Sequence, residues 1–297
     1  MDILVLAAGM ASRYGGLKQL EPVGRHGEVL LDYGIYDAVR SGCDRVVFVI
    51  RKDIESDFRS RVFDRIAAHV DCEYVFQDKT SRLPKSLFHL AQDRQKPYGT
   101  VQALLCAEDK IKSDFIIINS DDYYGASSYG MLCDHFKTSE KSALVGYQLD
   151  KTLLGGGRVN RGVCVFDSAG RLTGIEETYD IGVESGVVVG RTRTRNRVNM
   201  TGKEMASMNL FGFPHSVFPL LNEYWAKFTD RLRIDNSKEC VLSVFCDEKL
   251  TEGEIEFECY RAKDEWFGMT YKEDTPLVRA KIAKYIQQGV YPDCLWE

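Results

Sequence analysis

The stretch that decides the fold reads Leu4-Val5-Leu6-Ala7-Ala8-Gly9-Met10-Ala11-Ser12-Arg13-Tyr14-Gly15-Gly16-Leu17-Lys18-Gln19-Leu20. It opens with an apolar run, Ile3 to Leu6, that is typical of a buried strand. The strand leads into a loop of small residues that carries Arg13 and Lys18. Small residues let backbone N–H groups approach phosphate oxygens, and cations neutralise the phosphate charge. The stretch therefore predicts a phosphate-binding loop after the first strand of an α/β fold.

The two familiar phosphate loops do not fit this stretch. After Gly9 the dinucleotide pattern requires glycine at positions 11 and 14, where Ala11 and Tyr14 stand. The Walker pattern requires Gly-Lys-Ser/Thr, whereas Lys18 follows Leu17. The loop belongs to a different class of phosphate binder.

Composition narrows the class of protein. The chain has 297 residues, 44% hydrophobic and 28% charged, with a formal net charge of −5. An acidic balance argues against a dedicated nucleic-acid partner, and no apolar run approaches a membrane span. Nine cysteines are scattered singly without a C-x-x-C pair, which favours reduced thiols in a cytoplasmic protein. The chain runs into its first strand without a cleavable apolar leader, which also favours the cytoplasm.

The following segments alternate between strand and helix patterns. Strands are predicted at 46–50 and 72–76, and helices at 32–40 and 53–69. This alternation predicts an α/β fold with a mostly parallel, Rossmann-like sheet and helices on both faces. Ligands of such sheets bind beyond the carboxyl ends of the strands, where the first loop lies.

A second motif is a pair of carboxylates after a strand. The β-branched run 115–118 predicts a central strand, and Asn119 and Ser120 lead to Asp121 and Asp122 at its carboxyl end. Magnesium takes hard oxygen ligands and keeps several waters, so one or two carboxylates plus substrate phosphates suffice. The motif predicts a Mg²⁺ site there.

The second half of the chain is predicted in less detail. Segments 160–167 and 172–177 form a hairpin, and the arginines at 191, 193, 195 and 197 share one face of a solvated strand. The three glycines at 155–157 form either a lid hinge or a tolerant turn. We expect a strand at 207–213, helices at 217–228 and 236–250, a strand at 255–260, and a last helix from Pro276 to about Gln288.

The first motif resembles a known superfamily. The signature L-A-A-G-x-G-x-R, followed by K-x-L and a proline, reads here as Leu6 to Arg13 and then Lys18 to Pro22. It is similar to the nucleotidyltransferases that make nucleotide sugars, such as glucose-1-phosphate thymidylyltransferase and N-acetylglucosamine-1-phosphate uridylyltransferase. The segments M-N-L-F-G-F and W-F-G-M-T-Y-K-E-D also resemble a bacterial subgroup described only as nucleotidyltransferase. One departure is Ala11, which replaces the second glycine of the signature.

The resemblance implies a nucleotide site. In the family the first loop wraps a nucleoside triphosphate, which assigns Arg13 and Lys18 as catalytic cations. It places nucleotide-binding groups at the following residues: Leu6, Ala7, Ala8 and Gly9. The helix start Gly99-Thr100-Val101-Gln102 would face the base, with Gln102 reading its edge, and Asp122 would orient water or nucleoside.

The resemblance also implies an acceptor site on an inserted β-hairpin. In the family a glycine and a glutamate of this hairpin hold the sugar, which corresponds to Gly162 and Glu177. Thr178 stands where the family has a phosphate-binding lysine, so Arg161 and Lys272 are the candidate cations. Asn209 is a polar residue in an apolar strand, positioned to read the sugar.

The metal site is the least complete part of the resemblance. Asp121 matches the family's first metal ligand. The second ligand comes from W-x-D-x-G-T, and Gly268 occupies that aspartate's position. Asp264 and Asp274 are the nearby carboxylates, and we assign Asp264 as the second ligand.

The predicted function is transfer of a nucleoside monophosphate from a nucleoside triphosphate to a phosphorylated small molecule, preferably a sugar-1-phosphate, with release of pyrophosphate. The chain is expected to be a single nucleotidyltransferase domain over 1–297. Residues 1–135 would form the nucleotide-binding half and 136–297 the acceptor-binding half with the C-terminal helix. Two alternatives stay open: a cytidylyltransferase acting on phosphocholine or another phosphorylated alcohol, and an inactive regulatory homologue. The base, the acceptor and any homo-oligomer are left open.

Overall fold

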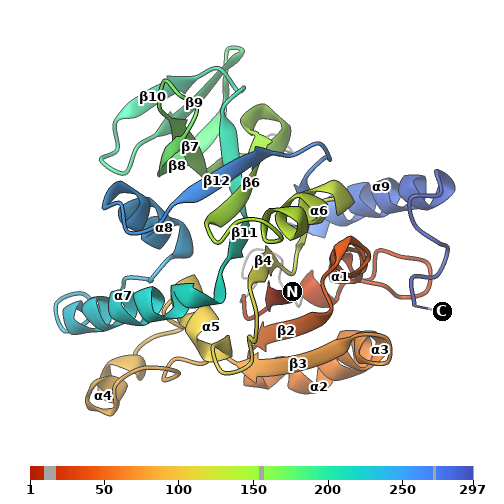
Figure 1. Ribbon diagram of the computed structural model, residues 1–297, viewed down its shortest axis with the longest axis horizontal. Helices are drawn as coiled ribbons and strands as arrows, with labels where there is room; N and C mark the ends of the chain where they lie inside the picture. The colour runs from red at the N-terminus through yellow and green to blue at the C-terminus, as the bar shows by residue number, and fades with distance from the viewer. Residues whose placement is uncertain (10–17, 154–156, 270–271, 297) are drawn as a thin grey trace.

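The computed structural model describes residues 1–9, 18–153, 157–269 and 272–296 (Figure 1). The residues outside these ranges include Arg13, Ala11 and two of the three glycines at 155–157. Lys18 lies within them, but the structure does not describe its side chain. No helix in the described ranges is long and apolar enough to cross a bilayer.

Four parallel strands form the first half of the sheet. They are β1 (Asp2–Leu6), β2 (Arg45–Ile50), β3 (Asp71–Phe76) and β4 (Phe115–Asn119). β1 lies between β4 and β2, and β2 pairs with β3, all in parallel register. The prediction of a mostly parallel core sheet is confirmed.

The remaining strands extend this sheet in mixed orientation. β11 pairs antiparallel with β4, and the order continues through β7, β8, β9 and β10, while β6 and β12 form a second parallel pair beside β11. In Figure 1 β9 and β10 lie at the top and β2 and β3 at the bottom. The bounds are β5 Asp122–Tyr123, β6 Ser142–Gln148, β7 Val159–Phe166, β8 Leu172–Glu184, β9 Val187–Arg191, β10 Arg197–Met200, β11 Met205–Phe213, β12 Phe257–Arg261 and β13 Phe267–Gly268.

Helices cover both faces of the parallel strands because side chains alternate along each strand. Leu4 packs in a cluster with residues of α5, α7 and α8, whereas Ile3 and Val5 pack in a second cluster with residues of α1, α2 and α6. The helices are α1 Leu30–Ser41, α2 Glu55–Phe58, α3 Asp64–Ala67, α4 Phe88–Ala91, α5 Thr100–Ala107, α6 Ala126–His135, α7 Phe218–Arg231, α8 Leu242–Thr251 and α9 Thr275–Gln287. Short 3-10 segments are η1 Lys18–Leu20, η2 Lys52–Ile54, η4 Lys85–Leu87, η5 Leu149–Thr152, η7 His215–Val217 and η8 Lys272–Asp274, and η3 (Arg59–Phe63) is a π-helical turn.

Three predicted elements differ from the structure. The segment 236–241 is not helical, and α8 begins only at Leu242. The predicted helix 53–69 is divided by the π-helical turn η3. The arginines at 193 and 195 lie in the turn between β9 and β10 rather than on one strand face, and Arg195 adopts a positive φ of 68°. Alternation of residue types does not reveal this turn, which lies between the close partners Arg191 and Arg197 of a hairpin.

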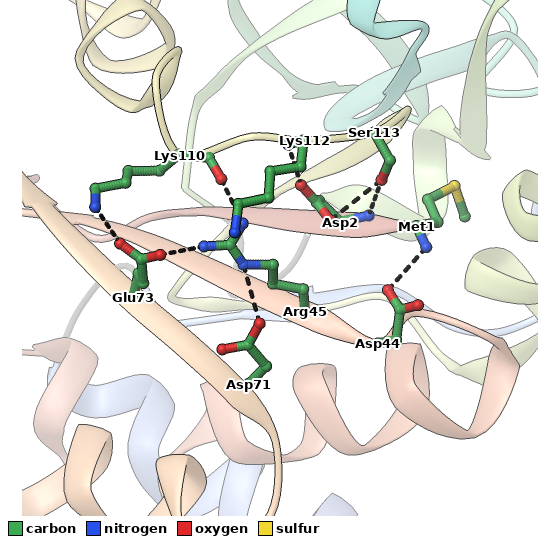
Figure 2. A network of polar contacts seen from close by, with 9 residues as sticks. All are labelled: Met1, Asp2, Asp44, Arg45, Asp71, Glu73, Lys110, Lys112 and Ser113. Carbon is green, nitrogen blue, oxygen red and sulfur yellow. Dashed lines mark hydrogen bonds and ion pairs between the residues drawn. The ribbon is translucent and has the colours of Figure 1, made fainter.

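The amino ends of the parallel strands are closed by a network of charges (Figure 2). Arg45 is 5% exposed and pairs with Glu73 and with Asp71, whose Oδ2 lies 3.2 Å from Nε. It also donates to the carbonyl of Lys110 at 2.7 Å. The buried Asp2 carboxylate accepts from the backbone N–H of Lys112 at 2.6 Å.

Behind β5 and β13, the C-terminal segment packs on α1. The Tyr291 hydroxyl lies 2.7 Å from Oδ2 of Asp37 and 2.8 Å from the Tyr123 hydroxyl. The Trp296 indole donates to Oδ1 of the fully buried Asp32 at 2.8 Å. These contacts fasten the C-terminus to the helix that follows the first loop.

Candidate functional site

Two adjoining cavities open at the carboxyl ends of the strands. The first cavity has a volume of about 370 Å³ and the second about 320 Å³, and Asn119, at the end of β4, lines both. The first is lined by Leu6, Ala8, Gly9, Gln19, Gln77, Lys96, Pro97, Gly99, Thr100, Ala103, Asn119, Ser120, Asp121 and Glu239. Most of these residues come from loops that follow parallel strands, as expected for an α/β sheet.

The first loop contributes its described end to the first cavity. Leu6, Ala8 and Gly9 line it, whereas the buried Ala7 does not. The N–H of Ala7 instead donates to the carbonyl of Val49 in β2 at 2.9 Å.

Gly99 shapes the opposite wall. Its φ is +105°, and a Cβ added there would lie 2.6 Å from the carbonyl oxygen of Cys240. Glycine is therefore required both by the backbone conformation and by the close approach of the 240 segment. Thr100 accepts the N–H of Leu242 at 2.7 Å through its hydroxyl, so the wall joins the starts of α5 and α8.

Gln102 lies outside the cavity, contrary to its predicted role at the base. Its side chain is fully buried, and its Nε2 donates to the carbonyls of Asp78 and Ser81 at 3.1 and 2.6 Å. Its Oε1 accepts from the N–H of Tyr98 at 2.7 Å. This amide fixes a loop, because both its donors and its acceptor are already engaged.

Gln77 is the amide that lines the first cavity. Its Nε2 donates to the Gly99 carbonyl at 2.9 Å and to Oε1 of Gln102 at 3.1 Å. Both partners are acceptors, so the amide orientation is determined. Within the described part of the chain its Oε1 makes no hydrogen bond, which leaves an acceptor on a 6% exposed residue at the cavity wall.

The carboxylate pair divides between the two cavities. Asp121 lines the first cavity and Asp122, the first residue of β5, lines the second. Asp122 was predicted on the nucleotide side. Its Oδ2 accepts from Nδ2 of Asn119 at 2.8 Å and from the Tyr124 hydroxyl at 3.2 Å.

The second cavity collects four of the five predicted acceptor residues. It is lined by Asn119, Asp122, Arg158, Val159, Asn160, Arg161, Gly162, Glu177, Ser207, Met208, Asn209, Ser243 and Trp266. Gly162 and Glu177 are cross-strand partners in β7 and β8. A Cβ at Gly162 would lie 2.8 Å from Ile175, so a side chain does not fit there. Glu177 accepts from the Ser243 hydroxyl at 2.5 Å.

Arg161 places a cation at the second cavity. Its guanidinium donates to the carbonyls of Thr152 and Asn160 at 3.0 and 2.9 Å, and lies 5.2 Å from the Trp266 ring centroid. No carboxylate of the described residues forms a salt bridge with it. Burial lowers the pKa of Arg161, although Asp122 and Glu177 nearby act in the opposite direction. The guanidinium remains charged at neutral pH because its ordinary pKa is so high.

Asn209 is held in an unusual conformation at the same cavity. It has a φ of +63° and lies where β11 shifts register against β6, between Ser207 and Phe211. Asparagine tolerates this left-handed region better than most residues. Its backbone N–H lies 3.4 Å from the Ser207 hydroxyl. Within the described residues its side-chain amide makes no hydrogen bond, so that amide is available at the cavity.

Two predicted residues lie elsewhere. Asp264 accepts from the N–H and the hydroxyl of Ser127 at 2.8 and 2.6 Å, and so caps the start of α6 outside both cavities. Lys272 is exposed in η8 and lines neither cavity. Among the described residues no group of three or more potential protein ligands could hold a metal.

The sequence reasoning missed several residues. Gln77 directly follows β3, and its position at a carboxyl strand end could have indicated it. Three further lining residues come from distant segments and carry no local signal: Lys96, Glu239 and Ser243. Trp266 belongs to a quoted motif, but its place at the second cavity was not predicted.

The site thus lies at the carboxyl edge of the parallel strands of a mixed α/β sheet, where two adjoining cavities meet. The family model of the MobA-like NTP transferase domain matches residues 3–152. The chain belongs to this family, and its enzyme class is nucleotidyltransferase.

Other comparisons bear on the fold. The chain is similar to a solved structure described as UDP-glucose pyrophosphorylase complexed with UDP-glucose. The identity is 14% and the TM-score 0.59, over 95% of this chain and 98% of that chain. This likeness shows a shared fold. The predicted superfamily is confirmed by the family model that matches residues 3–152. No curated protein matches the sequence.

Proposed function

We propose that the chain transfers a nucleoside monophosphate from a nucleoside triphosphate to a sugar-1-phosphate and releases pyrophosphate. The main support for this proposal is that the consecutive residues Asp121 and Asp122 line two adjoining cavities. A reaction between two substrates needs such a boundary, where their reacting atoms meet. The first cavity would take the nucleotide and the second the acceptor.

In the first cavity, nucleotide binding would use backbone and amide groups. Leu6, Ala8, Gly9 and Thr100 line this cavity. Ala8 and Gly9 would contact the polyphosphate where it enters the first loop, and Leu6 and Thr100 would lie nearer the nucleoside. Gln77 would accept a hydrogen bond from an N–H of the base through its Oε1. Gln102 would not contact the nucleotide but would fix the orientation of the Gln77 side chain, which donates to it.

In the second cavity, the polar groups suit a polyol phosphate. Glu177, Asp122 and Asn209 can accept hydrogen bonds from hydroxyl groups, and Arg161 offers a forked donor to a phosphate. A quaternary ammonium acceptor such as phosphocholine would need an open aromatic face. The ring of Trp266 is instead faced by Arg161, which favours the sugar over the cationic alternative.

The reaction would be an in-line displacement. An oxygen of the acceptor phosphate attacks the α-phosphorus, a new P–O bond forms, and the bond to the β-phosphate oxygen breaks, so that pyrophosphate leaves. A phosphate dianion is already nucleophilic and needs no general base. Catalysis is then positioning and charge neutralisation. By resemblance, Arg13 would stabilise the leaving pyrophosphate and Lys18 would contact both the α-phosphate and the acceptor phosphate.

Asp121 and Asp122 would hold a magnesium ion at the boundary between the cavities. Asp121 and Asp122 are hard oxygen donors, and phosphates and waters would complete the coordination. Asp264, the second ligand predicted from the sequence, is engaged at α6. A Cβ added at Gly268 would lie 2.4 Å from Oδ1 of Asp122, so glycine leaves room for the Asp122 carboxylate. We therefore propose Asp122 in place of Asp264. The ion would neutralise phosphate charge.

A pyrophosphate-release assay tests this function. Purified protein with Mg²⁺ is offered each of four nucleoside triphosphates with a panel of sugar-1-phosphates, phosphocholine and no acceptor. Release that depends on one sugar-1-phosphate supports the proposal. Release only with phosphocholine favours the alternative acceptor class. Nucleotide binding without release under any condition would identify an inactive homologue.

A further inference from the structure

A third cavity lies behind the acceptor site. Its volume is about 520 Å³, and it opens at the carboxyl ends of β6 and β12. The lining residues are Tyr147, Gln148, Lys151, Thr152, Arg261, Ala262, Lys263, Asp264, Glu265 and Trp266. β6 and β12 are parallel neighbours, so this cavity repeats, on the second parallel pair of the sheet, the placement of the first.

Three neutral side chains of this cavity already donate hydrogen bonds within the protein. The Tyr147 hydroxyl donates to the Tyr124 carbonyl at 2.7 Å, and Nε2 of Gln148 donates to Asp150 at 3.0 Å. The Thr152 hydroxyl donates to the Leu149 carbonyl at 2.8 Å.

The acidic groups are committed as well. Asp264 holds the start of α6, and Glu265 pairs with Lys281. Glu265 is therefore balanced by a cation, whereas Asp264 is held by neutral donors of α6 and has no salt bridge among the described residues.

The third cavity is also lined by three basic side chains that lack partners among the described residues. Within the described residues Lys151, Arg261 and Lys263 form no hydrogen bond or ion pair through their side chains. Elsewhere on the surface, basic residues commonly find carboxylates, as Lys141 does with Glu256 at 2.6 Å. Three unpaired cations around one concave surface create a positive potential, which favours an anion with more than one charge.

The third cavity shares a wall with the acceptor cavity. Trp266 lines both, and its buried Nε1 has no hydrogen-bond partner among the described residues. The Thr152 carbonyl accepts from Nη2 of Arg161 at 3.0 Å. Thr152, which lines the third cavity, therefore also holds the guanidinium of Arg161 at the second cavity.

We propose that the third cavity binds a small phosphate-type polyanion and thereby weakens acceptor binding. The bound anion would lie behind Arg161 and reduce the positive potential that this guanidinium presents to the acceptor phosphate. Coupling of this kind is reciprocal, so the acceptor would weaken binding of the anion to the same degree. The coupling rests on the proposed function, whereas the site itself does not.

Calorimetry tests the site directly. Inorganic pyrophosphate is titrated without Mg²⁺ into wild-type protein, the Arg261→Ala/Lys263→Ala variant, and an Arg231→Ala/Arg233→Ala control. The control removes the same charge from exposed positions that line none of the described cavities. We expect the first variant to lose one binding event or to bind at least about tenfold more weakly, with the control unchanged. Superimposed isotherms for the three proteins would overturn the site.

Kinetics test the coupling. Sulfate is added at constant ionic strength while the KM for the acceptor found in the release assay is measured. We expect about a two- to fivefold rise in wild type and control and none in Arg261→Ala/Lys263→Ala. An equal rise in all three would mean competition in the second cavity and would overturn the coupling. A chain that releases no pyrophosphate but still shows the calorimetric difference would refute the proposed function and keep the site.

Discussion

The two ends of the parallel strands β1 to β4 differ in how their polar groups are used. At the amino ends Arg45, Asp2 and Glu73 are paired within the protein (Figure 2). At the carboxyl ends Gln77 and Asn209 keep polar atoms that no described residue satisfies. A closed network contributes to stability, whereas unsatisfied groups at a cavity are available to a ligand. The polar groups that stabilise the fold therefore lie at one end of these strands, and those available to a ligand lie at the other end.

The largest expected effect is at the carboxyl end. Asp121→Asn keeps the shape but removes a charge from the boundary between the two cavities. We expect kcat to fall by about 10²- to 10³-fold, on the scale of losing one preorganised electrostatic contact, with an unchanged melting temperature. Steady-state pyrophosphate release and thermal unfolding measure the two quantities. If Asp122→Asn is damaging and Asp121→Asn is not, the order of the pair has been misassigned.

The complementary change is at the amino end. Arg45→Ala leaves Glu73 and Asp71 without their buried partner. Breaking a buried ion pair from one side costs about 3–5 kcal/mol; because Asp71 is largely exposed, we expect the lower end. Denaturant unfolding should show this loss, with kcat per folded molecule retained. A large fall in kcat at full folding would contradict the separation of the two ends.

The sequence predicted these two ends unequally. The run before Gly9 and the pair Asp121-Asp122 are local signals, because a strand end and its loop are adjacent in the chain. The role of Gln102 could not be predicted in this way. Its amide is engaged by the loop at 78–81 and by Tyr98, and such contacts depend on loop packing rather than on the helix start itself.

The second half of the site shows the same limit. Gly162 and Glu177 were assigned by the family resemblance of their hairpin, and both line the second cavity. Asp264 was assigned by its nearness in sequence to Gly268, yet it caps α6. Whether a carboxylate faces a cavity or a helix end is decided by tertiary packing, which a linear pattern does not contain.

A smaller effect is expected for the acceptor cation. Arg161→Ala removes a forked donor from the second cavity and should raise the acceptor KM by about 10- to 100-fold, the equivalent of a charged hydrogen bond of about 1.5–3 kcal/mol. The KM for the nucleotide should change little. Arg158→Ala is the matched control, because Arg158 is already paired with Glu184. Equal effects of the two variants would contradict the special role of Arg161.

The smallest effect concerns a charge buried behind the carboxyl end. Asp37 is fully buried on α1, and burial raises its pKa to about 7, against the opposing influence of Arg40 and of the hydrogen bond from Tyr291. The folded pKa lies above the unfolded value, so the folded state binds the extra proton. Its stabilising contribution is present in full below the unfolded pKa near 3.8 and is lost as pH rises through about 7. Between pH 6 and 8 the folded state binds on average about half a proton more than the unfolded state at this group. Over two pH units this excess corresponds to a loss of about 1.4 kcal/mol of unfolding free energy. We expect Asp37→Asn to remove this slope, measured as the difference in unfolding free energy between wild type and variant at the two pH values. If the unfolding free energies of wild type and Asp37→Asn changed in parallel with pH, Arg40 would keep Asp37 ionised throughout this range. Ion pairing within the protein would then extend from the amino ends of the strands to the helix that supports their carboxyl ends.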